Sequence, residues 1–260
     1  MTALLALMSH FGLFVLVLCR TSGIFLAAPG LSSEALPMLV KVLAVGSISV
    51  CLLPVAMAAG GADAATASWL AFGLAAVKEL VVGLVLGFFA LLAFTGVQVA
   101  GEMVSEQMGF ALSQEADPMT EAETSVVGQL ATVLGLLLFL AVDGHHWLLA
   151  ALARSFERMP VGGVNLTQAT LERVVGGFVG MYESGVVLAA PVLCATLLTT
   201  VAVGVVSRVV PQINALTLSF PLKVAVGLII FGAALPFMTY AAEKQFVAMG
   251  RGLGPLIGGR

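Results

Sequence analysis

Two long uncharged apolar segments constrain the fold of this chain more than any other feature. Leu80–Gly101 and Thr124–Val142 contain no acidic or basic residue. A helix rises 1.5 Å per residue, so about 20 residues cross a hydrocarbon core of roughly 30 Å. The whole chain shares this character: 60% of its residues are hydrophobic and 10% are charged, whereas a soluble domain is about 25% charged. The sequence therefore predicts an all-α, polytopic integral membrane protein.

An acidic segment separates the two apolar ones. Glu102–Glu123 holds six of the 14 acidic residues and no basic residue, and Met103, Met108, Phe110 and Met119 lie within it. We predict a loop here that contacts another part of the protein or a partner. A solvated connector is the alternative, because runs of like charge are commonly solvated.

The remaining helices are expected to be interrupted. Proline, glycine or charged residues fall inside or between most apolar runs, and proline bends or ends a helix. Pro54 is expected to bend or end the second helix, and Pro191 to kink the fifth. The expected helices are about Thr2–Ala27, Pro37–Ala58, Ser68–Gly101, Glu123–Val142 broken at Asp143–His146, and Leu166–Arg208, followed by a hairpin with its tip near Phe220–Lys223, the apolar arm Val224–Ala242 and a flexible tail.

Several charged residues fall inside these apolar helices. An ionisable group at membrane depth usually lines an aqueous path or meets a partner, and pairing inside the helix bundle is the alternative. Adjacent residues point about 100° apart on a helix, so Lys78 and Glu79 need not pair with each other. The candidate intramembrane or interface charges are Arg20, Lys78, Glu79, Glu183, Arg208 and Lys223.

The sequence offers little support for catalysis or for a metal. His145 and His146 are adjacent, so we expect them to face different ways on a helix and to form a poor chelating pair. HExxH and GxSxG motifs are absent from the sequence, as is any CxxC pair. We expect no enzymatic activity, no cofactor and no bound metal, and an intramembrane enzyme using Asp143 and the two histidines is the alternative. The chain carries no basic cluster that would indicate nucleic-acid binding.

An ordered set of short motifs resembles the FliR/SctT family of export-gate proteins of type III secretion. The set covers almost the whole chain, and no single motif is decisive. Its members are Arg20-Thr-Ser-Gly23, Ala28-Pro29, Lys78-Glu79 with Gly83 and Gly87, Ala100-Gly101, Gln107-Met108-Gly109-Phe110, Asp117-Pro118, Asp143-Gly144-His145, Arg154-Ser155-Phe156, Pro160, Ala190-Pro191 and Arg208-x-x-Pro211-Gln212-x-Asn214.

The resemblance implies a subunit of a channel rather than an enzyme. Such proteins join FliP-like and FliQ-like subunits in a gate that passes unfolded flagellar proteins across the bacterial inner (plasma) membrane. The gate lies in the flagellar basal body and works with FlhB-like and FlhA-like export components. Interrupted helices fit this setting, because neighbouring subunits cover polar groups that lipid would leave unsatisfied.

The resemblance also implies that the loop near the chain's middle plugs the channel. We expect one domain over residues 1–260, with N-terminal helices (1–101), the acidic plug-like loop (102–123), C-terminal helices and hairpin (124–250) and a flexible tail (251–260). Met side chains can repack around varied partners, which suits a deformable seal. The expected plug residues are Glu106, Gln107, Met108, Gly109, Phe110 and Asp117.

Two further functions remain open at this point. One is the corresponding SctT subunit of a virulence secretion system, which shares the same motifs. The other is a stand-alone, proton-coupled transporter that uses Glu79, Glu183 and Lys223 as relays within the membrane.

Overall fold

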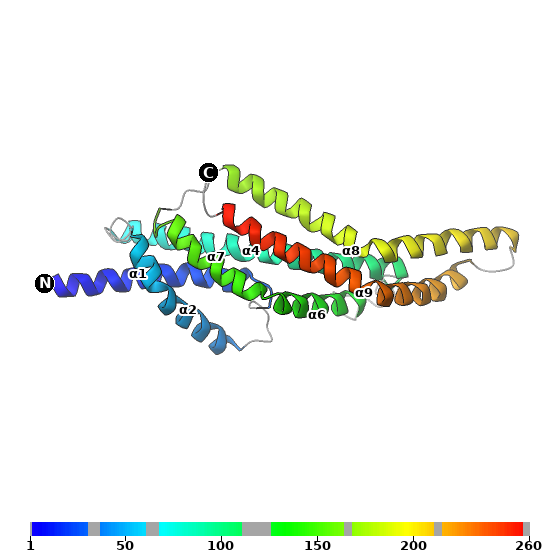
Figure 1. The fold of residues 1–260 in the computed structure, drawn as a ribbon, viewed down its shortest axis with the longest axis horizontal. Coiled ribbons are helices and arrows are strands. Elements are labelled where there is room, and N and C mark those ends of the chain that lie inside the picture. The colour runs from blue at the N-terminus through cyan, green and yellow to red at the C-terminus, as the bar shows by residue number, and fades with distance from the viewer. Residues whose placement is uncertain are drawn as a thin grey trace. The chain divides into compact units, whose positions relative to one another are not determined.

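The computed structural model describes residues 2–30, 37–60, 68–110, 126–163, 168–210 and 215–256, and every regular element in these ranges is an α-helix (Figure 1). The prediction of an all-α protein is therefore confirmed. The helices are α1 (Thr2–Ala27), α2 (Met38–Ala59), α4 (Trp69–Met108), α6 (Val126–Ala141), α7 (Gly144–Arg158), α8 (Gln168–Val209) and α9 (Ala215–Leu256).

Four of these helices are long and apolar enough to cross a membrane. They are α2, α4 and most of α8 and α9, and the pair α6 and α7 would add a fifth span if counted together. Their apolar windows have mean hydropathies between 2.0 and 2.5. The prediction of a polytopic membrane protein is confirmed at the level of length and composition.

The predicted break after the second long apolar segment is confirmed. α6 ends at Ala141 and α7 begins at Gly144, and Asp143 between them adopts a left-handed backbone with φ of 57°. Pro54 does not end the second helix, because α2 continues through it to Ala59, and its predicted bend stays a prediction. A membrane helix tolerates an internal proline when neighbouring groups satisfy the freed carbonyl.

The acidic segment begins as helix, not as loop. We expected α4 to end near Gly101, but it continues through Met108. Ala100, Val104 and Met108 are fully buried at a spacing of four residues. This spacing marks one face of a helix, and burial of that face extends the helix beyond the change in charge.

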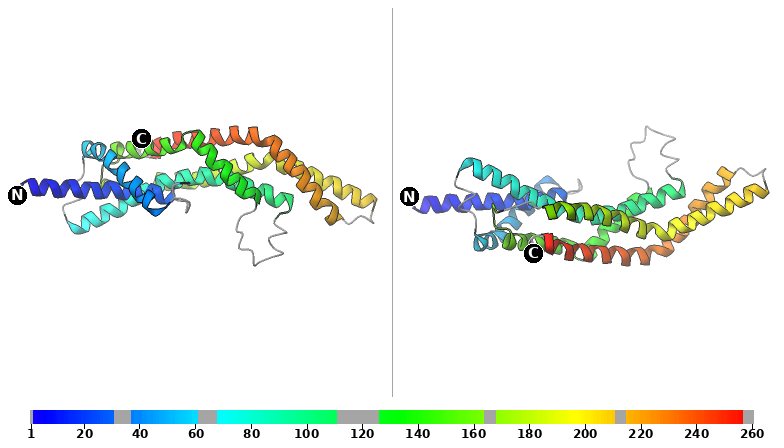
Figure 2. Two further views of the ribbon diagram at one scale, coloured as in Figure 1. Left: turned by 90° about the horizontal axis from the view of Figure 1, so that it is seen from below. Right: turned by 90° about the horizontal axis from the view of Figure 1, so that it is seen from above.

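The C-terminal hairpin lies elsewhere than expected. The sequence placed its tip near Phe220–Lys223, but these residues lie inside α9, which runs unbroken to Leu256. α8 and α9 are themselves the two arms and run antiparallel (Figure 2). Residues 251–256, expected to belong to a flexible tail, are helical.

The chain divides into two compact units. Unit 1 comprises Met1–Leu92, Asp143–Gly177 and Val247–Arg260, and unit 2 comprises Ala93–Val142 and Phe178–Phe246. In unit 1, α1 contacts α2, and α2 contacts α7. The backbones of α1 and α4 also approach closely there, because a Cβ atom at Gly83 would collide with the carbonyl of Arg20. A small residue at position 83 thus lets the two helix backbones come close together, as small residues do in membrane helix pairs.

Unit 2 packs α4, α6, α8 and α9 together. A Cβ atom at Gly96 of α4 would lie 2.7 Å from Ser184 Oγ of α8 and 2.8 Å from Gln245 Nε2 of α9. Gln245 donates a hydrogen bond of 2.6 Å to Ser184 Oγ. The three helices therefore meet at one small residue, with polar side chains joining two of them.

Candidate functional site

Arg20 lies on the buried face of α1. That face also carries Leu13, Leu16, Val17 and Ile24, which follow helical spacing and are almost fully buried. Arg20 has no exposed surface. Burying a guanidinium without partners is costly, so the surrounding chain has to satisfy its donors.

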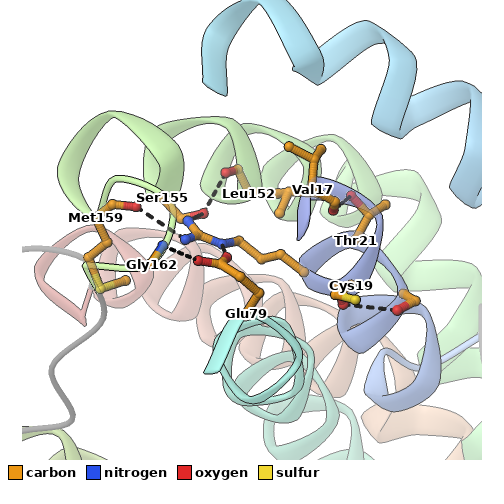
Figure 3. A network of polar contacts seen from close by, with 10 residues as sticks. Val17, Cys19, Thr21, Glu79, Leu152, Ser155, Met159 and Gly162 are labelled. Carbon is orange, nitrogen blue, oxygen red and sulfur yellow. Dashed lines mark hydrogen bonds and ion pairs between the residues drawn. The ribbon is translucent and has the colours of Figure 1, made fainter. Parts of the chain in front are cut away.

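Each nitrogen of the Arg20 guanidinium donates a hydrogen bond within unit 1 (Figure 3). Nε donates to Glu79 Oε2 of α4 at 2.5 Å, and Nη1 donates to Ser155 Oγ of α7 at 3.0 Å. Nη2 donates to the carbonyl of Met159 at 3.1 Å. The other Glu79 oxygen, Oε1, accepts from the backbone N–H of Gly162 at 3.0 Å. One ion pair thus joins α1, α4, α7 and the segment that follows α7.

The neighbours of the ion pair complete its enclosure. The Phe156 ring lies 4.2 Å from the Arg20 guanidinium carbon, in the arrangement of a cation–π contact. Ser155 Oγ in turn donates to the carbonyl of Leu152 at 2.6 Å. Glu79 and Ser155 have no exposed surface. Both carboxylate oxygens of Glu79 are bound, and the side chain is closed to solvent. The ion pair is therefore suited to holding helices together and not to transferring protons.

Sequence reasoning identified the two charges but not their partners. Arg20 and Glu79 were expected as separate membrane charges, and the structure brings them together. Ser155, Met159 and Gly162 were not expected to bind them. The sequence of α7 carried one signal, because its spacing places Ser155 on the same helix face as Leu148, Leu152 and Phe156. The structure buries this face.

The other candidate charges lie at the surface of the helices. Lys78, Glu183 and Arg208 are exposed and Lys223 is half-buried. None of the four forms an ion pair with another residue in the described part of the chain. Lys78 is exposed while Glu79 is buried, which confirms that the two need not pair.

The predicted plug residues lie at and beyond the end of α4. Glu106 is exposed, Gln107 and Phe110 are half-buried, and Met108 has no exposed surface. Asp117 lies outside the described residues. The roles of these residues in a plug stay a prediction.

A glycine turn ends α4. Gly109 adopts a φ of 93°, which favours glycine. Its N–H donates to the carbonyl of Glu106 at 2.9 Å, and the N–H of Phe110 donates to the carbonyl of Ser105 at 3.2 Å. These two bonds form a Schellman motif, which satisfies carbonyls at a helix C-terminus. The chain leaves α4 in a direction fixed by this motif.

The end of α4 packs against α9 within unit 2. A Cβ atom at Gly227 would lie 2.7 Å from both Cε and Cγ of Met108. A Cβ atom at Gly109 would lie 3.0 Å from the Phe220 ring. Met108 therefore occupies space that only a glycine at position 227 leaves open. Sequence reasoning assigned no role to Gly227 and placed Phe220 at a hairpin tip rather than beside the end of α4.

Three potential metal ligands gather at the start of α7. Asp143, His145 and His146 each offer a ligand atom, and these atoms lie within 4.8 Å of one another. The two imidazole rings are 4.2 Å apart between centroids at an interplanar angle of 35°. The expectation that the adjacent histidines face different ways is wrong, because the two rings lie together despite the backbone offset of about 100° between neighbouring helical residues.

Comparison with known proteins gives one consistent family. The family described as "Bacterial export proteins, family 1" matches residues 11–249. The chain is 29% identical over 239 residues to the flagellar biosynthetic protein FliR of Escherichia coli, covering 92% of this chain and 90% of that protein. It is 32% identical over 176 residues to FliR of Bacillus subtilis, covering 66% and 68% of the two chains. It is also 29% identical over 177 residues to Yop proteins translocation protein T of Yersinia pestis, covering 66% and 67%.

Proposed function

The chain belongs to the bacterial export proteins, family 1, and from that premise we propose that it is an export-gate subunit of a flagellar type III secretion apparatus. It joins FliP-like and FliQ-like subunits to form a channel for unfolded flagellar proteins across the inner membrane. FlhB-like and FlhA-like components complete the apparatus. The chain contributes structure to this channel and no catalysis.

Exposed charges on apolar helices carry this proposal. Lys78 and Glu183 lie inside two of the candidate spans, and both are exposed on the surface of the chain. Around them lie exposed apolar side chains such as Leu74, Val77 and Val179. Lipid covers the apolar groups at no cost but leaves a charge unsatisfied, at about 2.5–3.5 kcal/mol near the membrane centre. Partner subunits can cover both kinds of group.

The extent of apolar exposure supports the same proposal. Only 17% of the most apolar window of α2, and the same share in α9, is buried within the chain. Such helices need either lipid or other proteins around them. Together with the exposed charges, they favour a subunit that is completed by neighbours over a bundle that is complete by itself.

We further propose that the segment from Glu106 to Asp117 acts as the channel plug. The start of this segment, its root at Glu106–Phe110, packs against α9, because Met108 is fully buried beside Gly227. A plug attached at a fixed root can move beyond that root without displacing the helices. Met108 and Phe110 supply apolar surface at this root, in keeping with a deformable seal.

Co-purification tests the subunit proposal. The full chain, purified from its own host through an affinity tag, is expected to carry FliP-like and FliQ-like subunits. Lys78→Ala and Glu183→Ala are each expected to lower their recovery several-fold and to reduce motility. Glu157→Ala is the matched control, because Glu157 is exposed on α7 outside the four candidate spans. A monomeric protein that moves a solute in liposomes by itself would overturn the proposal.

A virulence secretion role is a second candidate, supported by the match to the Yersinia protein. Deleting the gene separates the two systems by the exported proteins that disappear from the culture medium. Loss of flagellar filament proteins from the medium indicates the flagellar system, and loss of virulence effectors indicates the other.

The geometry does not favour a proton-coupled transporter. Such a mechanism would require Glu79 to exchange protons with water, but this side chain has no exposed surface and both its oxygens are bound. Glu183 and Lys223 remain available, yet neither forms an ion pair with another described residue.

A further inference from the structure

We propose that Asp143, His145 and His146 bind a divalent transition metal ion, with zinc as the expected ion. This inference goes beyond the proposed export function and does not depend on it. All three residues belong to unit 1 and lie within four positions at the start of α7. The family match assigns no metal to them.

The separations of the ligand atoms fit one metal ion. His146 Nδ1 lies 3.0 Å from Asp143 Oδ1, and the largest separation in the group is within 4.8 Å. Zinc bonds to histidine nitrogen and carboxylate oxygen are about 2.0–2.2 Å long, so two ligands of a tetrahedral ion lie roughly 3.3–3.5 Å apart. The side chains of His146 and Asp143 are 67% and 65% exposed, so both can rotate to close the remaining difference.

Two local features are explained by a bound cation. Asp143 occupies the N-cap position of α7 but makes no side-chain capping hydrogen bond, although aspartate at this position usually caps. Its carboxylate contacts His146 instead. His145 Nδ1 is buried and has no hydrogen-bond partner in the described part of the chain. Buried polar atoms are nearly always bonded, so an orphaned imidazole nitrogen within a ligand cluster points to a missing partner.

The donor set favours zinc or a neighbouring transition metal over magnesium or calcium. Imidazole nitrogen suits zinc, copper and nickel, whereas magnesium and calcium take oxygen ligands. Three protein ligands leave a fourth position open to water or to another group. A metal at this place would tie the left-handed residue Asp143 to the first turn of α7.

The electrostatic surroundings permit a cation. The N-terminus of α7 carries a partial positive charge of about half a unit, which opposes a metal ion. The Asp143 carboxylate offsets it. The nearest basic residue along α7 is Arg154, nine residues after His145 and therefore about 13 Å away along the helix at 1.5 Å per residue.

Metal binding by the full chain tests the proposal. The full chain is purified in detergent through a tag without histidines, stripped with a chelator and titrated with Zn²⁺ alone. About one zinc per chain is expected by mass spectrometry, and Co²⁺ in its place should give visible absorption bands of low-coordinate cobalt. His146→Ala and Asp143→Asn are each expected to weaken Zn²⁺ binding by about tenfold or more, since even the loss of an outer partner costs about 10–100-fold.

The chain offers matched controls. His10→Gln removes the remaining histidine of the sequence, and Glu157→Gln removes an exposed carboxylate of the same helix; both should bind zinc as the wild type does. Cobalt spectra of the wild-type protein need no variant, so a folding defect in a variant leaves the proposal testable. Zinc well below one per chain, or equal loss of binding in His10→Gln, would overturn it and leave Asp143 and His146 as an ordinary exposed pair.

Discussion

At the scale of residues, four groups contact the buried Arg20 side chain. Arg20 donates to a carboxylate, a hydroxyl and a backbone carbonyl, and it also contacts an aromatic ring. Removing one member of a buried ion pair leaves the other charge uncompensated, whereas replacing both with apolar groups is often tolerated. The network should therefore behave as a unit when it is mutated.

We expect Arg20→Met and Glu79→Leu each to destabilise the protein by about 3–5 kcal/mol, because each leaves a buried charge unpaired. The double variant should lose much less than the sum of the two. Thermal unfolding of the purified protein in detergent measures both effects. Arg154→Met, at an exposed position of α7, serves as the control and should change stability little. Additive losses in the double variant would show that the two side chains act independently.

At the scale of elements, apolar patterning predicted most helices but not how far they extend. Thr2–Ala27 and the break before Gly144 follow from uncharged runs and from local breakers, which act within a few residues. The continuation of α4 to Met108 depends on burial against α9, which lies more than 100 residues later in the sequence. Local sequence signals carry no information about such a distant contact. The acidic residues after Gly101 instead favoured a loop over a helix.

The same limit explains what was missed at the candidate site. Arg20 and Glu79 were identified because charges are rare in apolar helices. Ser155 and Gly162 were missed because neither is unusual where it occurs, and only folding brings them to the ion pair. Gly227 was missed for the same reason, since glycine is common in membrane helices.

The contact between α4 and α9 gives a prediction at this scale. Gly227→Ala should destabilise unit 2 by about 1–3 kcal/mol, because its Cβ atom would overlap the Met108 side chain. Met108→Ala should cost about 2–5 kcal/mol through the cavity it leaves. The double variant should lose less stability than the two single variants add up to. The methyl group added at position 227 would occupy part of the cavity that the Met108→Ala change leaves. Unfolding in detergent provides the double-mutant cycle.

Gly232 provides the matched control for this cycle. It lies on the same helix, and a Cβ atom there would meet nothing within 4 Å. Gly232→Ala is expected to be neutral or to stabilise α9 by about 0.5–1 kcal/mol, since alanine loses less conformational entropy in a helix. A loss at position 232 as large as that at position 227 would mean that the helix, and not the Met108 contact, is responsible.

At the scale of the whole molecule, the chain is apolar enough to enter a membrane and yet leaves charges on the surfaces of its apolar helices. These two properties are compatible when other subunits surround it, which is the basis of the proposed export gate. The buried ion pair holds the helices of unit 1, and Met108 at the end of α4 packs against α9 in unit 2. The proposed plug is thus attached to a packed element and not to a free loop.

Deleting Gln107–Leu112 tests the plug in the assembled gate. The deletion removes Met108 and Phe110, so a closed channel should lose its apolar seal while α1 and the Arg20 network remain. We expect increased entry of ions or small molecules into cells that express the variant, with FliP-like and FliQ-like subunits still co-purifying. Glu157→Gln is the matched control, because this exposed side chain of α7 lies outside the proposed plug and supplies no apolar surface. Since a deformable seal excludes ions through apolar contact, wild-type leakage with an intact complex would show that another segment closes the channel.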